Sequence, residues 1–95
     1  MTSIVIPRLA GTRERAGQVS SSLPESLSGL IVTIDAQDVA SASQSFSDEL
    51  CKQILVDRDA SRLDVHNASP QLARYLNTSA RIRGVAVRLV VDVRP

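Results

Sequence analysis

Residues 30–56, LIVTIDAQDVASASQSFSDELCKQILV, decide the fold of this chain. The stretch opens with Leu30–Asp35, which is almost wholly apolar and rich in β-branched side chains, as is typical of a strand. A strand this apolar is expected where helices cover both faces of a sheet. A linker of small residues, Ala36–Ser43, leads from this strand to the strongest helix signal in the chain. A strand followed directly by a helix indicates an α/β protein.

The helix of this unit is predicted over Ser45–Val56. Ser45 stands three residues before Asp48, in the spacing of a capping box. Asp48 and Glu49 are expected in the first turn, where the helix dipole favours negative charge. Asp48 and Lys52 have the order and spacing of an i,i+4 ion pair. The apolar face of this helix is formed by Phe46, Leu50, Ile54 and Leu55, and Cys51 borders it.

Upstream of this unit, the sequence predicts one strand and one helix. Ser3–Ile6 is rich in β-branched residues, which favours a strand. Pro7 cannot donate a hydrogen bond to a neighbouring strand, so this strand is expected at an edge of the sheet. A helix is predicted from Thr12 to about Ser22, and its glycine and serines make it a weak one.

Downstream, the pattern predicts a strand, a helix and a last strand. Ser61–His66 alternates between polar and apolar residues, as a short strand does. Ser69 and Pro70 are typical of the first residues of a helix, and Gly84 can close that helix in the left-handed conformation. Val85–Val93 is predicted as the last strand, with its alternate apolar residues on one face.

The predicted order β-α-β-α-β-α-β implies an α/β fold. We expect a single-layer, mainly parallel four-stranded sheet with three helices, joined by right-handed crossovers. With 95 residues, 43% of them hydrophobic, the chain has the size of one domain. We assign residues 1–95 to that domain: residues 1–29 hold an edge strand and the first helix, and residues 30–95 form its core.

Composition argues against several kinds of partner and site. Eleven basic and ten acidic residues leave a net charge of +1, and aromatic residues make up only 2%. Neither nucleic acid nor an anionic membrane is therefore an expected partner. The single cysteine, Cys51, cannot form an intramolecular disulfide or a cysteine-based zinc site. Because the sequence shows neither a signal segment nor an apolar run of membrane-spanning length, we expect a cytoplasmic protein. We expect no metal and no cofactor, since the usual ligand and cofactor motifs are missing.

Polar residues after the predicted strands are the candidates for a site, because ligands of open α/β sheets bind beyond the carboxyl ends of the strands. Serines before the predicted helix either hold a phosphate at its N-terminal amides or only cap the helix. Acidic residues in the same loop either form a carboxylate pair or turn the chain. The candidate anion-binding residues are Asp35, Asp38, Ser43 and Ser45, and His66, Asn67 and Asp92 are expected at the same edge.

Other reactive or charged residues have ordinary structural explanations. His66 has no second histidine nearby in the sequence and is expected to be solvated or hydrogen-bonded. Cys51 lies inside a predicted helix and is expected to be buried and inert. Arg81, Arg83 and Arg88 are expected to form a solvated face rather than an RNA-binding stripe. None of the motifs GxxxxGK(S/T), GxGxxG and GxSxG is present, so we expect no enzymatic activity.

Several stretches together resemble a known domain family. Ile31–Val39 and Ser43–Leu50 resemble the apolar strand, the acidic turn and the Asp-Ser-Ser-Gly helix start of the STAS domain, the fold of anti-anti-sigma factors. Ser69–Leu72, followed by Leu76, resembles the next helix of that family. Within that helix start, Ser45–Leu50 is closer still to a group of STAS-like domains of uncharacterised function, whose members also carry a stretch similar to Gly11–Glu14. The joint spacing of these stretches carries the resemblance.

The resemblance implies a regulatory module that binds a partner protein, often an ATP-binding serine kinase of the anti-sigma type. In the family, the first serine of the helix start is phosphorylated to break that complex. Here Gln44 occupies the acceptor position, Ser43 replaces the preceding acid and Phe46 replaces the glycine. Ser43 or Ser45 would have to replace the acceptor, and a docking surface without the switch fits equally well. The residues expected to dock the partner or to carry a phosphate are Ser43, Gln44, Ser45, Ser47 and Asp48.

Three hypotheses about function remain open from the sequence. The first is a non-enzymatic interaction module that docks a protein partner through the second predicted helix and its serine-rich loop. The alternative is a small nucleotide- or phosphate-binding protein or enzyme that uses the strand carboxyl ends and the N-terminus of the same helix. The third is a structural subunit that oligomerises through sheet edges, of which Ser3–Ile6 is the candidate.

Overall fold

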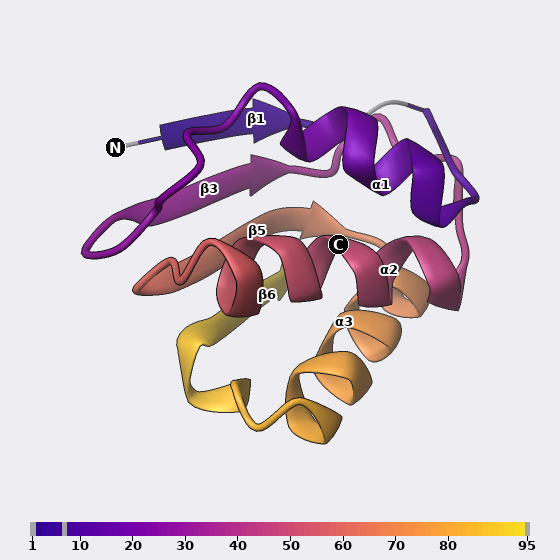
Figure 1. Cartoon of the computed structure of the whole chain (residues 1–95). Coiled ribbons are helices and arrows are strands. Elements are labelled where there is room, and N and C mark those ends of the chain that lie inside the picture. Colours follow the sequence, from indigo (N-terminus) through magenta and orange to yellow (C-terminus); the bar gives the residue numbers. More distant parts are fainter. Residues whose placement is uncertain (1, 7, 95) are drawn as a thin grey trace.

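One parallel sheet with three α-helices makes up the computed structural model, which describes residues 2–6 and 8–94 (Figure 1). The strands follow the order β1-β3-β5-β6, and each pairs in parallel with its neighbours. The predicted α/β class, sheet and helix content are confirmed. The strands are β1 (Thr2–Val5), β3 (Ile31–Asp35), β5 (Arg62–Ala68) and β6 (Leu89–Val93). The helices are α1 (Arg13–Ser20), α2 (Gln44–Cys51) and α3 (Pro70–Ile82).

Four smaller elements complete the chain. The strands β2 (Leu9–Ala10) and β4 (Ser41–Ala42) pair in parallel as a separate ribbon. A π-helix, η1 (Lys52–Asp57), continues α2, and a 3₁₀-helix, η2 (Ala86–Arg88), precedes β6. The sequence predicts a plain linker where β4 lies. The β2–β4 ribbon matters for the site because it holds the loops before α1 and α2 next to each other.

All three helices pack as one layer against one face of the sheet. α1 contacts α2, α2 contacts α3, and the sheet lies behind them in Figure 1. In the central strand β3, Val32 and Ile34 are fully buried, whereas the alternate residue Thr33 is partly exposed. On the outer face the edge-strand residues Val5 and Val90 are exposed. The expectation that helices cover both faces is therefore wrong. β3 is almost wholly apolar because it lies between β1 and β5, which leaves its outward side chains only partly exposed on the open face.

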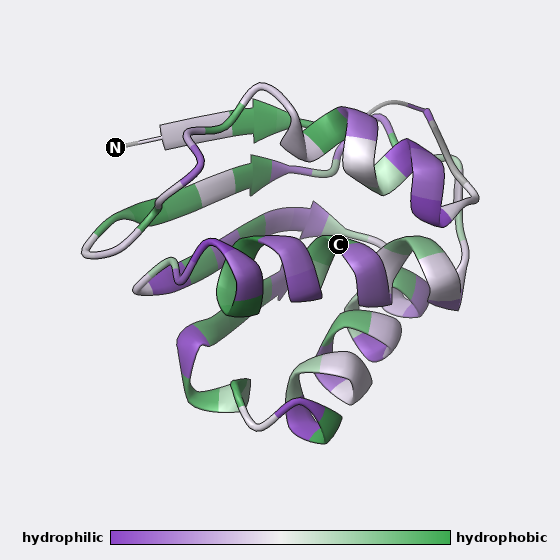
Figure 2. Ribbon diagram, viewed as in Figure 1, coloured by the Kyte–Doolittle hydropathy of each residue, from purple (hydrophilic) through white to green (hydrophobic). Residues whose placement is uncertain are grey.

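The core is built almost entirely from aliphatic side chains, and Phe46 is its largest fully buried residue. Figure 2 shows mainly hydrophobic residues along β3, and a mixture of hydrophobic and hydrophilic residues along the helices. Among the strands that the structure describes, β1 pairs only with β3, which confirms the predicted edge strand. Pro7 itself lies outside the described residues.

α3 begins and ends where the sequence predicts. The Ser69 hydroxyl accepts a hydrogen bond from the Leu72 amide at 3.1 Å, and Pro70 is the first helical residue. Gly84 has a φ of +74° and follows the last turn. The Val85 amide then donates to the Ala80 carbonyl at 2.8 Å. This pattern is a Schellman motif, so Val85 belongs to the helix end.

The last strand is shorter than predicted. Residues 86–88 form η2, and Val87 is 94% exposed, so β6 begins only at Leu89. The alternating valines predict a strand from Val85, but they carry no signal for the η2 turn. Val85 closes the end of α3, so it is not available to begin the strand. The helix predicted over Ser45–Val56 matches α2 and η1 together.

Candidate functional site

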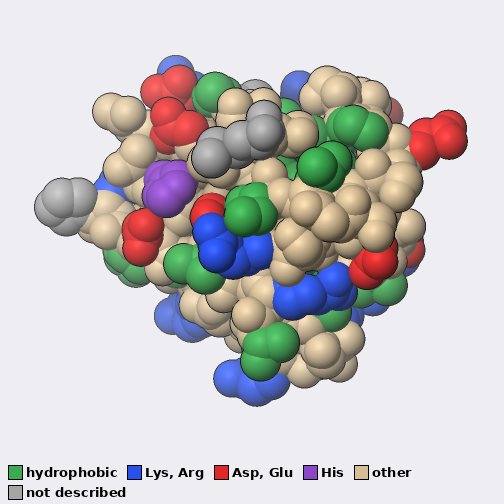
Figure 3. All heavy atoms as spheres, turned by 90° about the vertical axis from the view of Figure 1, so that its left-hand side faces the viewer, with side chains coloured by type: hydrophobic (Ala, Val, Ile, Leu, Met, Phe, Trp, Pro, Cys, Tyr) green, Lys and Arg blue, Asp and Glu red, His purple; other side chains and the backbone are tan. Residues whose placement is uncertain are grey.

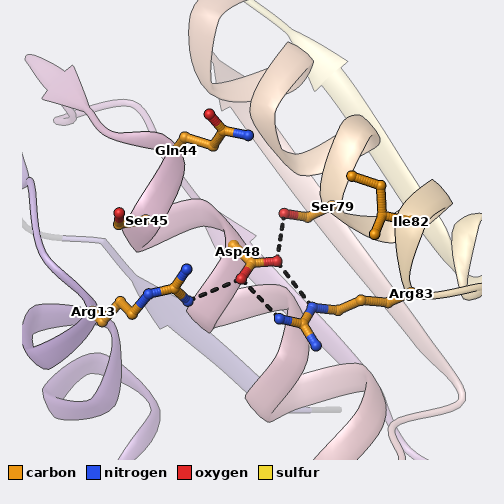
Figure 4. Close-up of a pocket in the computed structure, with 7 residues that line it drawn as sticks. All are labelled: Arg13, Gln44, Ser45, Asp48, Ser79, Ile82 and Arg83. Carbon is orange, nitrogen blue, oxygen red and sulfur yellow. Dashed lines mark hydrogen bonds and ion pairs between the residues drawn. The ribbon is translucent and has the colours of Figure 1, made fainter.

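A hollow of about 410 Å³ opens between the three helices (Figure 4). α1 contributes its first residue to the walls, α2 its N-terminal part, and α3 its C-terminal turn and the cap residue after it. The lining residues are Arg13, Gln44, Ser45, Asp48, Ser79, Ile82 and Arg83. Three of the residues predicted to dock a partner, Gln44, Ser45 and Asp48, thus lie together at one cavity.

The first turn of α2 is held in place by Ser43. Its backbone is extended, with φ −102° and ψ 161°, and its hydroxyl accepts from the Phe46 amide at 3.0 Å. The same hydroxyl donates to the Gly11 carbonyl at 2.9 Å, which ties the loop before α1 to the start of α2. The prediction that Ser45 caps this helix is wrong, because the chain is already helical from Gln44 and Ser45 lies in the first turn.

Among the predicted residues of this loop, exposure differs sharply. Gln44 and Ser45 are exposed at the rim of the hollow, and within the described residues neither side chain makes a hydrogen bond. Ser47 is fully buried, and its hydroxyl donates to the Ser43 carbonyl at 2.9 Å. Gln44 and Ser45 are therefore the two members of the set that a partner can reach without unfolding the helix.

Asp48 forms the floor of the hollow and joins the three helices. Its carboxylate accepts from Arg83 at Nε (2.9 Å) and Nη2 (2.8 Å), which is a bidentate pair. It also accepts from Arg13 Nη1 and from Ser79 Oγ, each at 2.9 Å. The Arg83 hydrogen bonds, aided by Arg13 and Ser79, hold the pKa of Asp48 well below its usual range, although partial burial opposes the shift.

This arrangement corrects two predictions about charge on α2. Because the helix begins at Gln44, Asp48 lies beyond the first turn. The first turn of α2 contains no acidic residue. Lys52 does not pair with Asp48; its Nζ lies 3.6 Å from Glu49 Oε2 and 3.4 Å from Asp57 Oδ2. Arg83, at the C-terminal cap of α3, competes better for Asp48, since its guanidinium binds both carboxylate oxygens at once.

A second acid, Glu49, extends the network toward α1. It accepts from Gln53 Nε2 at 2.8 Å and from Arg13 Nη1 at 3.2 Å, and these contacts together with Lys52 lower its pKa. Gln53 in turn is hydrogen-bonded to the Ser20 hydroxyl of α1. Polar contacts therefore connect α1 to α2 before the small buried residue Ala16 and to η1 after it.

The charges of the hollow are thus largely matched to each other. Asp48 is ionised and accepts four hydrogen bonds, so its lone pairs are already engaged and it has little capacity to take a proton from a substrate. Arg13 and Arg83 are each bound to a carboxylate. What the hollow offers to a partner is its shape, the exposed amide of Gln44, the Ser45 hydroxyl and the apolar side chain of Ile82.

The other predicted site residues gather at a different place, the carboxyl ends of β3, β5 and β6. Asn67 Nδ2 donates to Asp35 Oδ1 at 3.3 Å, and His66 Nδ1 lies 3.1 Å from Asp92 Oδ2. The Gln37 amide is the main cause of a lowered pKa at Asp35, and Asn67 adds to it. Figure 3 shows the histidine (purple) beside acidic side chains (red).

The four candidate anion-binding residues do not share one cavity. Of Asp35, Asp38, Ser43 and Ser45, only Ser45 lines the hollow. Asp35 turns the chain by accepting the Gln37 amide at 2.9 Å, in the manner of an Asx turn. In the part of the chain that the structure describes, no group of three or more histidine, cysteine or acidic residues is arranged to hold a metal ion.

Sequence reasoning missed the arginines of the site. Arg83 and Arg88 are not on a solvated face: Arg83 binds Asp48, and Arg88 donates to the Leu55 and Ala60 carbonyls at 2.7 and 2.8 Å. One signal was present: Asp48 stands three and seven residues before the buried Cys51 and Leu55, on their side of the helix, where a charge needs a partner. Cys51 is buried as predicted, and desolvation raises its pKa to about 11.

No protein-family model, curated protein or solved structure matches this chain. Among the described residues, none of the helices is both long and apolar enough to cross a membrane.

Proposed function

We propose that this protein is a non-enzymatic, regulatory interaction module of the STAS type. It docks an ATP-binding, serine-kinase-like protein through the first turn of α2 and the loop before it. The observation that carries the proposal is the exposed pair Gln44 and Ser45 at the rim of a hollow whose charged groups are already paired with each other. Such a partner requires ATP, so the proposal implies a cytoplasmic protein.

The chemistry of the hollow supports binding over catalysis. A general base must be free to accept a proton near neutral pH, whereas Asp48 has a strongly lowered pKa and four hydrogen-bond donors. The thiol of Cys51 is buried with a raised pKa, so it is a poor nucleophile. The charged groups of the hollow pair with each other, and two polar side chains remain exposed at its rim. This arrangement suits the recognition of a protein surface.

A phosphorylation switch in this loop would have to use Ser45. The hydroxyl of Ser43 makes two hydrogen bonds that position α2, and Ser47 is buried inside the helix packing. Ser45 alone of the three is exposed with its hydroxyl unengaged in the described part of the chain. A phosphate there lies in the first turn of α2, where the helix dipole favours negative charge.

Calorimetric titration against the serine-kinase-like ATP-binding protein of the same genome tests the proposal. We expect a complex whose affinity falls about tenfold or more in Gln44→Arg and in Ser45→Asp, because each change places a charge in the interface. Gln18→Arg on α1 and Ser3→Asp on the outer face of the sheet are matched controls, since both residues are exposed and distant in sequence from the α2 start. Absence of a complex, or equal losses in test and control variants, would contradict the proposal.

The alternative of a nucleotide- or phosphate-binding protein has one observation in its favour, namely that Arg13 and Arg83 both line the hollow. Both guanidinium groups are bound to Asp48, so an added phosphate would have to displace a carboxylate or lie next to it. We place this function second. Calorimetry with ATP, ADP and a sugar phosphate at millimolar concentration distinguishes the two, and heat of binding that is lost in Arg13→Gln would favour the alternative.

A further inference from the structure

α3 and the turn after it carry basic residues without any acidic ones. Between Asp64 and Asp92 the sequence contains no aspartate and no glutamate. The arginines in this interval are Arg74, Arg81, Arg83 and Arg88. A stretch of this length with one sign of charge is unusual in a chain whose overall charge is only +1, because acidic and basic residues are otherwise nearly balanced.

Only two of these four arginines are neutralised. Arg83 is paired with Asp48, and Arg88 with Asp59. Arg74 and Arg81 are exposed, and within the described residues neither forms an ion pair. Seven residues apart on a helix, they point in nearly the same direction. The solvent face of α3 therefore presents two uncompensated positive charges.

The same end of the molecule presents its most exposed apolar side chains. Within the described residues, Ile82 at the end of α3 is 75% exposed and Val87 in η2 is 94% exposed, more than any other large hydrophobic residue. α3 and η2 contact each other, so these side chains lie on neighbouring segments. Figure 2 shows both segments at the lower edge of the molecule, and Figure 3 shows basic and hydrophobic side chains there without an acidic one in the lowest part.

Fold stability explains only part of this combination, since Arg81 lies in the last turn of α3, where the helix dipole favours positive charge, and Arg74 lies over the ring of Tyr75. Arg74 and Arg81 add no ion pair, and the exposed side chains of Ile82 and Val87 bury little apolar surface. Arg74 lies 5.7 Å from the ring of Tyr75, which is half-buried beside it on the helix. Arginine and tyrosine are enriched, and acidic residues are depleted, in protein-binding surfaces.

We infer that the surface formed by Arg74, Arg81, Ile82 and Val87 docks a second protein segment that is acidic and apolar. Charge complementarity selects acidic side chains opposite the two arginines, and the two aliphatic residues provide the contact that excludes water. A protein segment fits better than nucleic acid, because stacking of bases requires exposed aromatic rings and only the half-buried Tyr75 is present. The inference does not rest on the proposed kinase-like partner or on Gln44 and Ser45.

A random peptide library selected on the immobilised, full-length protein tests this inference. We expect enrichment of peptides with net negative charge and aliphatic residues, and we expect their affinity to fall about tenfold or more in the double variant Arg74→Glu/Arg81→Glu. Ile82→Ser is expected to weaken the same peptides about fivefold. Arg74→Gln/Arg81→Gln, a milder change at exposed positions, keeps the test valid should charge reversal disturb folding.

The matched control is Arg8→Glu/Arg15→Glu, which alters the net charge by the same amount at two other exposed arginines without an ion pair in the described residues. It should leave the peptide affinity within about twofold. Failure to enrich acidic peptides, or an equal loss in the control, would overturn the inference. Binding of a single-stranded RNA oligonucleotide that the Arg74 and Arg81 variants abolish, with no acidic peptide bound, would overturn it in favour of nucleic acid. Ile82 also lines the hollow, whereas Arg74 and Arg81 do not, so the arginine variants separate this outcome from that of the kinase-like partner.

Discussion

At the scale of single residues, Asp48 shows how one side chain can organise a small protein. Its side chain is 19% exposed and sits where the three helices meet. A carboxylate so placed is unfavourable on its own, and the bidentate contact with Arg83 together with the donors Arg13 and Ser79 offsets that desolvation. The residue therefore stabilises the fold only as long as its partners stay in place.

Replacement of Asp48 by asparagine is expected to lower the free energy of unfolding by about 2 kcal/mol, because Arg83 and Arg13 lose their charged acceptor in a partly buried place. Urea unfolding followed by circular dichroism measures the change. Asp92→Asn is the control, since the Asp92 side chain is 66% exposed and its loss should cost less than about 0.5 kcal/mol. Equal losses in the two variants would contradict the central place of Asp48.

The contribution of Asp48 should also depend on pH. Its pKa is lower in the folded protein than in the unfolded chain, so the stabilisation is complete above the ordinary value of about 3.8 and is lost as the pH falls below it. Arg13 and Arg83 stay charged throughout, and the asparagine variant does not titrate here. The stability gap between wild type and Asp48→Asn should narrow by about 1 kcal/mol between pH 6 and pH 2.5. A stability gap that does not change with pH would show that the charge of the Asp48 carboxylate does not stabilise the fold.

At the scale of elements, the position of α2 depends on a single cap. Ser43 satisfies the Phe46 amide and also reaches the Gly11 carbonyl, so one hydroxyl fixes both the start of α2 and the loop before α1. The β2–β4 ribbon runs beside this contact and supports it. Gln44 and Ser45 are presented at the hollow because the helix starts one residue after Ser43 and not at Ser45.

The two serines should therefore differ in their effect on stability. Ser43→Ala is expected to cost about 1–2 kcal/mol, since it removes the cap and the link to Gly11, whereas Ser45→Ala should cost less than about 0.3 kcal/mol. Denaturant unfolding of the two alanine variants gives the comparison. A larger loss in Ser45→Ala would mean that the helix begins later than the structure has it.

At the scale of the whole molecule, the sheet has one covered and one open face. The chain adds its strands in the order of the sequence, and every helix joins the same layer. The covered face holds the aliphatic core. The open face carries side chains such as Val90, which is 44% exposed. The hollow between the helices lies on the helical layer, away from the open face. The same holds for the surface formed by Arg74, Arg81, Ile82 and Val87.

Truncation of valines on the two faces tests this one-sided architecture. Val65 on β5 is fully buried, and Val65→Ala is expected to lower the free energy of unfolding by about 2 kcal/mol through lost burial and the cavity left behind. Val90 lies on the neighbouring strand β6 with its side chain on the open face, and Val90→Ala should cost less than about 0.7 kcal/mol. Comparable losses would indicate that something covers the open face in solution.

The sequence by itself determined the order and type of the main elements, because those depend on local chemistry. Ser69, Pro70 and Gly84 set the ends of α3 through hydrogen bonds and dihedral angles within a few residues of each other. The apolar periodicity of the other segments likewise needs no knowledge of distant residues. Errors appeared where two local signals compete, as at Val85, which ends a helix although it begins a run of alternating valines.

Only the tertiary structure decided which side chains meet. Arg13 and Arg83 each stand 35 residues from Asp48, on opposite sides of it in the chain, and no local pattern selects them over the nearby Lys52. The side of the sheet on which the helices pack is equally non-local, since it depends on how three successive crossovers share one layer. A long-range contact requires the fold to bring its partners together first, and for that reason the hollow and its ion pairs emerged from the structure alone.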